Sequence, residues 1–126
     1  MGRVLIVEDN ELNLKFFNDL LNILEHETIM SRDGIDLLNI VNSTKPELIL
    51  MDIHLNGISG IDLITLLKSN VATQHIPIIT ITAFAMKSDE AKISKSGCNM
   101  YLSKPVSIEV FFDAIQKFLP KTTINN

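Results

Sequence analysis

The sequence alternates between short apolar runs and longer stretches in which apolar residues recur every three or four positions. Several of the runs are apolar throughout, as is typical of strands that are covered on both faces. The intervening stretches have helical periodicity. The five runs are residues 4–7, 28–30, 48–51, 78–81 and 100–102. Five strands alternating with five helices predict a doubly wound α/β fold, in which helices cover both faces of a parallel sheet.

Length and composition are those of one compact domain. The chain has 126 residues, of which 46% are hydrophobic and 21% are charged, and these values suit a globular domain with its own core. We expect one domain over residues 1–120 and a polar tail over 121–126. The expected helix boundaries are N-caps at Asn10, Ser88 and Ser107, a weaker N-cap at Asp33, and a helix end at Gly97.

Charge and cysteine content exclude several classes of protein. The net charge of −4 argues against sequence-independent nucleic-acid binding, which rests on a basic surface. The single cysteine, Cys98, excludes an internal disulfide framework and a metal site of several cysteines. No apolar run approaches the roughly 18 residues that a membrane span needs, and the N-terminus does not look like a secretory signal. We therefore expect a cytoplasmic protein without membrane insertion.

Polar side chains follow the apolar runs at the points where the expected strands end. Glu8 and Asp9 follow the first run, Asp52 the third, Thr82 the fourth and Lys104 the fifth. A flavodoxin-like strand order of 2-1-3-4-5 makes the first and third strands neighbours at the point where the order reverses. The acidic side chains would then converge in one crevice at the carboxyl edge of the sheet.

Three converging carboxylates have a specific chemistry. They repel one another, so their pKa values rise unless a cation is present. An all-oxygen site suits a hard cation such as Mg²⁺, and the cluster, one divalent cation and Lys104 together have a net charge near zero. A carboxylate such as that of Asp52 can attack phosphorus, while Thr82 and Lys104 can contact phosphoryl oxygens. The alternative for any single acidic residue after a strand is a loop residue or helix cap, but the combination favours a site.

Together these motifs resemble the receiver domains of two-component response regulators. The resemblance extends from Val4 to about Leu119 and implies the CheY-like form of the predicted fold. The matching segments are Val4 to Asn10, Asp33-Gly34, Leu48 to Asp52, Gly57, Ser59-Gly60, Ile81 to Ala83, Gly97 and Ser103 to Pro105.

The resemblance implies a role for each residue of the crevice. Asp52 would be the phosphoryl acceptor, with Mg²⁺ held by the side chains of Glu8, Asp9 and Asp52 and by the backbone carbonyl of His54. Thr82 and Tyr101 would form the switch pair. Lys104 would neutralise the phosphoryl group, and its bond to Pro105 would be cis.

The expected function is a phosphorylation switch and not an enzyme that turns over external substrates. A histidine kinase would supply the phosphoryl group, and a kinase, phosphatase or phosphotransfer protein would be a partner. Because no effector domain follows Leu119, the output would be protein–protein interaction through the fourth helix, fifth strand and fifth helix. The likeness is greatest to regulators of bacterial cell division, for which recruitment to a cell pole through partners stays open.

Other interpretations stay open at this point. A phosphorelay intermediate and a chemotaxis-type receiver share the same motifs. A phosphohydrolase with an aspartate nucleophile typically has a second acid two residues later, where this chain has His54. A flavodoxin-like cofactor module needs a phosphate-binding loop where Glu8 and Asp9 would repel phosphate. The His54 side chain either lies over the crevice or faces solvent, and Phe84 belongs to the crevice rim or to a docking face.

Overall fold

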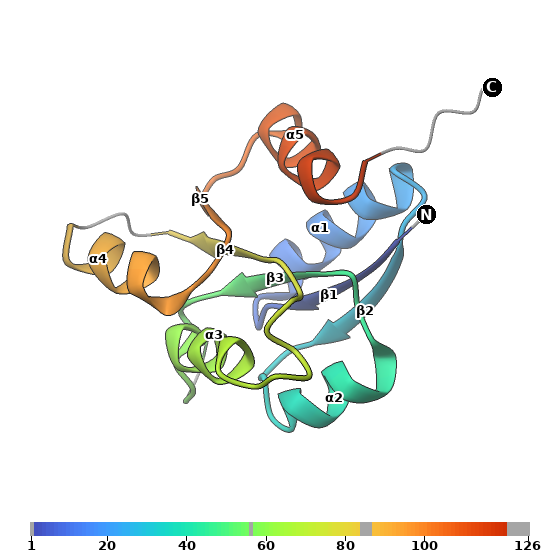
Figure 1. The fold of residues 1–126 in the computed structure, drawn as a ribbon. Helices are drawn as coiled ribbons and strands as arrows, with labels where there is room; N and C mark the ends of the chain where they lie inside the picture. The colour runs from blue at the N-terminus through green and yellow to red at the C-terminus, as the bar shows by residue number, and fades with distance from the viewer. Residues whose placement is uncertain (1, 56, 84–86, 121–126) are drawn as a thin grey trace.

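A computed structural model describes residues 2–55, 57–83 and 87–120, with the side chains of residues 87–89 left out (Figure 1). It contains a five-stranded parallel sheet in the order β2-β1-β3-β4-β5, which confirms the predicted fold class and strand order. The strands are β1 (Arg3–Val7), β2 (Glu27–Ser31), β3 (Leu48–Asp52), β4 (Ile78–Thr82) and β5 (Met100–Ser103). The helices are α1 (Glu11–Ile23), α2 (Leu37–Thr44), α3 (Gly60–Lys68), α4 (Lys87–Ser96) and α5 (Ile108–Phe118).

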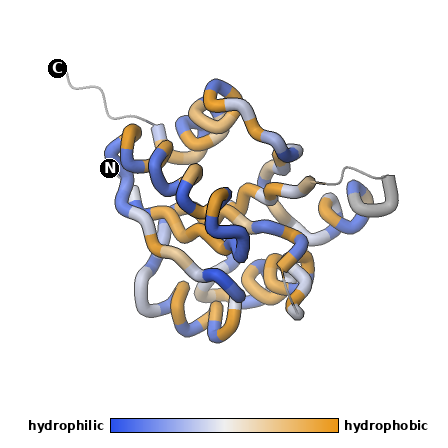
Figure 2. Tube along the Cα trace, turned by 180° about the vertical axis from the view of Figure 1, so that it is seen from behind, coloured by the Kyte–Doolittle hydropathy of each residue, from blue (hydrophilic) through white to orange (hydrophobic). Residues whose placement is uncertain are grey.

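Helices cover both faces of the sheet, and each face has its own hydrophobic core. On one face, alternate residues of β1, β3 and β4 pack against α1 and α5, with the ring of Phe111 fully buried. On the other face, the intervening residues pack against α2 and α3. Helix α4 lies beside α3, next to the end of β4 (Figure 1). In Figure 2 the central strands are mostly coloured as hydrophobic, whereas the helices alternate between the two colours.

The helix starts test the predicted caps. Asn10 and Ser107 are confirmed, because their side chains accept hydrogen bonds from the backbone N–H groups of Asn13 and Val110. Ser88 is wrong as a cap, since α4 begins one residue earlier. Asp33 is also wrong, because its carboxylate accepts from the N–H of Ile35 and closes a turn that precedes α2.

Helix α4 ends where the sequence predicts, before Gly97. Gly97 follows α4 directly with φ +94°, a left-handed conformation that glycine adopts without strain, so the predicted helix end is confirmed. The predicted tail, residues 121–126, lies outside the described residues. Across the described residues, the helices are all too short or too polar to cross a bilayer.

Candidate functional site

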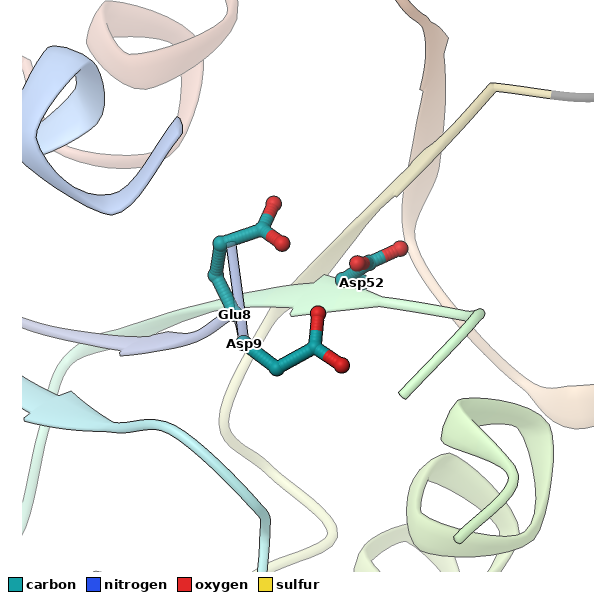
Figure 3. Close-up of side chains that lie close together, drawn as sticks. All are labelled: Glu8, Asp9 and Asp52. Carbon is teal, nitrogen blue, oxygen red and sulfur yellow. The ribbon is translucent and has the colours of Figure 1, made fainter. Parts of the chain in front are cut away.

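Three carboxylates meet at the carboxyl edge of the sheet, where β1 and β3 end side by side. The parallel register pairs Val7 with Met51, so the residues that follow, Glu8 and Asp52, are brought together, and Asp9 comes next on the chain. One oxygen from each of the three carboxylates lies within 4.8 Å of the others. Figure 3 shows the three side chains extending from the two strand ends toward the same space. The predicted convergence of the acidic residues is confirmed.

The cluster is mostly buried, and burial changes the proton affinity of Glu8. Glu8 is 1% exposed and Asp52 is 5% exposed, while Asp9 is half-buried. Loss of solvent around Glu8, together with the neighbouring Asp52 carboxylate, raises the pKa of Glu8 to about 7. The backbone N–H of Asn10 donates to Glu8 Oε2 and opposes this rise. Burial is therefore the main cause of the raised pKa of Glu8, and the neighbouring Asp52 carboxylate adds to it.

Lys104 supplies the positive charge at the edge of the cluster. Its Nζ lies 3.0 Å from Glu8 Oε1 and 3.5 Å from Asp52 Oδ2, and its side chain is 18% exposed. The backbone also holds this residue in place, because its N–H donates to the carbonyl of Thr82 at 2.7 Å. The bond from Lys104 to Pro105 is cis, as the resemblance to receiver domains implies.

Thr82 completes the same edge from the end of β4. It is fully buried, and the register pairs the preceding residue, Ile81, with Asp52 on β3. The sequence therefore predicts correctly that a hydroxyl, a lysine and three carboxylates share one rim of the sheet.

The loop from β3 to α3 folds back directly onto Asp52. The backbone N–H of His54 donates to Asp52 Oδ1 at 3.1 Å, and the N–H of Gly60 donates to the carbonyl of Ile53 at 2.9 Å. The side chain of His54 is exposed, which favours the solvent-facing interpretation. A Cβ atom at Gly60 would lie 2.6 Å from Ile53 Cα and still closer to the Asp52 carbonyl oxygen. The sequence motif contains Gly60, but this close approach is visible only in the structure.

Tyr101 lies apart from the acidic cluster. Its side chain is 37% exposed on β5, and its hydroxyl donates to Glu90 Oε1 of α4 at 3.1 Å. Accepting this hydrogen bond, the Glu90 carboxylate raises the pKa of the Tyr101 phenol. Nothing in the sequence indicates Glu90 as a partner, because the pairing depends on where α4 lies against β5. Phe84 lies outside the described residues.

The donor set fits a hard divalent cation. Carboxylate oxygens are the ligands that Mg²⁺ and similar ions prefer, and among the described residues Lys104 provides the one ammonium group within 4 Å of Glu8 and Asp52. Such a site attracts a cation, and the cation in turn makes the site receptive to an anionic phosphoryl group.

The family model of the response regulator receiver domain matches residues 4–116. The chain belongs to this family. Two curated receivers illustrate the likeness: the polar-differentiation response regulators DivK of Brucella anthropi and Brucella ovis. Each is 47% identical to this chain over 116 residues, which cover 92% of the chain and 94% of the relative.

Solved receiver structures agree with the fold. The receiver domain of the sensor histidine kinase PA1611 from Pseudomonas aeruginosa has a TM-score of 0.86 and 26% identity, over 94% of this chain and 97% of that one. That crystal structure has a magnesium ion coordinated in its active-site cleft. The chemotaxis protein CheY4 of Vibrio cholerae has a TM-score of 0.86 at 19% identity, over 94% and 98% of the two chains. At that identity the likeness shows the fold alone.

Proposed function

We propose that this receiver is a phosphorylation switch whose acceptor is Asp52. The observation that carries the proposal is the convergence of three carboxylates and one lysine at a single edge of the sheet. A histidine kinase is the proposed donor, and the phosphohistidine of the kinase provides the phosphoryl group.

In the proposed transfer, an oxygen of the Asp52 carboxylate attacks the phosphorus atom of the phosphohistidine. A P–O bond forms, the P–N bond breaks, and the imidazole leaves with the electron pair and takes up a proton. Lys104 Nζ, 3.5 Å from Asp52 Oδ2, is placed to donate to a phosphoryl oxygen. The buried hydroxyl of Thr82 is proposed to donate to another.

The proposed cofactor is Mg²⁺, held by the side chains of Glu8, Asp9 and Asp52 and by the backbone carbonyl of His54. When bound, it supplies positive charge that offsets the carboxylates and the incoming phosphoryl group. Two features support it: the acidic cluster itself, and the magnesium in the cleft of the PA1611 receiver domain.

The proposed output is a change of the surface formed by α4, β5 and α5. Phosphorylation would draw Thr82 toward the phosphoryl group and let Tyr101 turn inward, shifting a pre-existing equilibrium between two conformations. Tyr101 of β5 is 37% exposed, and Ile108 and Val110 of α5 are 50% and 48% exposed. Exposed apolar side chains of this kind offer contact area to a protein partner.

The proposed biological setting is that of the DivK relatives, which are named polar-differentiation response regulators. At 47% identity over 94% of their length, a related role in cell division and polar recruitment is the interpretation that the comparisons favour. Phosphorylation-dependent binding of protein partners would be the output in that setting.

The decisive experiment is incubation of the purified chain with acetyl phosphate and Mg²⁺, followed by intact-protein mass spectrometry. We expect the wild type to gain the mass of one phosphoryl group with Mg²⁺ and not with a chelator. Asp52→Asn should gain none, and Asp113→Asn, which removes an exposed carboxylate from α5, should behave as the wild type does. Labelling of Asp52→Asn at the wild-type level would refute the assignment of the acceptor.

The same preparation separates the alternative functions. A phosphohydrolase would release inorganic phosphate from a small phosphate ester over many turnovers, whereas the switch stops at about one phosphoryl group per chain. A phosphorelay intermediate would pass the group on to a histidine phosphotransfer protein, with loss of the added mass from this chain.

A further inference from the structure

The hydrogen bond between Tyr101 and Glu90 joins two elements that few other contacts hold together. Among the described side chains of α4, residues 90–96, Ile93 is the single buried apolar one. By contrast, α5 buries Phe111, Ala114 and Ile115. Helices in proteins are held chiefly by their apolar faces, and with one buried apolar side chain among these residues, the hydrogen bond of 3.1 Å between Tyr101 and Glu90 adds a polar contact between α4 and β5.

Tyr101 shares a face of the sheet with Thr82. Met100 and Leu102 pack against the core formed with α1 and α5, and side chains alternate along a strand, so Tyr101 points to the opposite face. On β4, Ile79 and Ile81 belong to that same core, which places Thr82 on the opposite face too.

The strand register places Tyr101 near that threonine. Tyr101 pairs with Thr80, two residues before Thr82 on β4, and side chains two residues apart on a strand lie on the same face. The phenol is instead held outward, where its hydroxyl donates to Glu90. Turning the ring toward Thr82 would have to break that hydrogen bond.

We propose that Glu90 is a latch that holds Tyr101 outward and thereby favours the resting conformation of the switch. The inference rests on the proposed function, in which an inward Tyr101 belongs to the phosphorylated conformation. The strength of the latch then sets the fraction of molecules in which Tyr101 points inward before any phosphoryl group arrives. Removing one hydrogen bond of this kind should raise the inward population roughly two- to tenfold.

The composition of the chain makes the test specific. Tyr101 is its single tyrosine, and it has no tryptophan, so biosynthetic 3-fluorotyrosine gives one fluorine resonance from this ring. The solvent isotope shift of that resonance, measured between H₂O and D₂O, reports how exposed the ring is. Wild-type protein with beryllium fluoride and Mg²⁺, a mimic of the phosphoryl group, provides the reference for the switched conformation.

We expect Glu90→Ala, without metal or phosphoryl mimic, to lower the solvent isotope shift toward the switched reference. Alanine is a strong helix former, so α4 should remain helical, which circular dichroism checks. Glu90→Gln keeps an oxygen acceptor and should stay near the wild type. Glu109→Gln, an exposed position in the first turn of α5, removes a charge elsewhere and should not change the shift.

In Glu90→Ala, an unchanged isotope shift would overturn the latch, and so would a larger one, which would mean that the ring is more exposed. If Glu109→Gln changed the isotope shift as much as Glu90→Ala does, the effect would be due to net charge, and this too would overturn the latch. The proposed function fails separately, if acetyl phosphate and Mg²⁺ do not label Asp52. The latch is measured without phosphoryl donor, so its outcome stands apart from that result.

Discussion

The ammonium group of Lys104 lies 3.0 Å from the Glu8 carboxylate, although the two residues are 96 positions apart in the sequence. Lys104→Met should therefore have two opposite effects. Without Mg²⁺ the free energy of unfolding should fall by about 1–2 kcal/mol, because a buried carboxylate loses its counter-charge. The affinity for Mg²⁺ should rise, since a competing positive charge is gone. Urea unfolding and a Mg²⁺ titration followed by melting temperature measure the two quantities.

A lysine that lies outside the cluster serves as the control for this substitution. Lys117→Met removes an exposed charge from the last turn of α5 and should leave the Mg²⁺ affinity unchanged. A weaker affinity for Mg²⁺ in Lys104→Met would show that the lysine assists the site and does not compete with the cation.

The mutual repulsion of the carboxylates can be tested by removing one of them. Asp52→Asn should raise the free energy of unfolding of the metal-free protein by about 1 kcal/mol, because Glu8 loses a repelling neighbour. At saturating Mg²⁺ the wild type should gain more stability than the variant, since it keeps the third carboxylate. Thermal unfolding with and without Mg²⁺ measures both. A lower melting temperature of the variant without Mg²⁺ would contradict the repulsion.

The location of this site could be predicted from the sequence because it follows from strand polarity. Parallel strands end at one edge, so the polar residues after each apolar run had to meet there once the strand order was known. Helix starts were harder, because several polar residues near a start can act as caps. Asp33 closes a turn, and α2 begins only after Asp36, whose φ of +61° is left-handed.

Contacts between elements were beyond the reach of the sequence. The pairing of Tyr101 with Glu90 depends on where α4 lies against β5, and no periodicity or motif specifies that distance. The tight approach of Gly60 to Asp52 likewise depends on how the loop folds back onto the strand. Both features come from tertiary packing and not from local propensity.

The tight approach of Gly60 to Asp52 predicts that any side chain at position 60 lowers the free energy of unfolding. Gly60→Ala would place a methyl group against the backbone of Asp52 and Ile53, which cannot move without moving the acceptor. We expect a loss of about 1–3 kcal/mol in the free energy of unfolding and slower labelling by acetyl phosphate at saturating Mg²⁺. Denaturant unfolding and a time course of intact-protein mass measure the two effects.

The same substitution at a second glycine of this loop gives a matched control. Gly57 has φ +84°, but apart from its two chain neighbours the described residues have no atom within 4 Å of where its Cβ would be. Gly57→Ala should cost about 1 kcal/mol through its left-handed backbone, with labelling per folded molecule close to that of the wild type. Equal labelling rates for Gly60→Ala and Gly57→Ala would refute a specific effect on the acceptor.

His26 makes stability depend on pH at the opposite end of the sheet. Its ring is 9% exposed, and Nδ1 accepts a hydrogen bond from the backbone N–H of Gly2 at 2.9 Å. Burial, with a further contribution from the N-terminal charge, lowers the pKa of His26 below its ordinary value of 6.5. The unfolded chain therefore binds more protons below about pH 6.5, and the stability that His26 contributes is complete above that pH and lost as the pH falls.

Glu8 titrates with the opposite sign, because its pKa is raised from 4.5 to about 7 and stability falls as the pH rises through that range. The informative quantity is therefore the difference between the pH profiles of unfolding free energy of a variant and of the wild type. His26→Gln should remove part of the loss of unfolding free energy below about pH 6.5, whereas His75→Gln, at an exposed position, should follow the wild-type profile. Urea unfolding across this pH range, without Mg²⁺, measures it. Parallel profiles for His26→Gln and wild type would show that the folded protein accommodates a protonated His26 without cost.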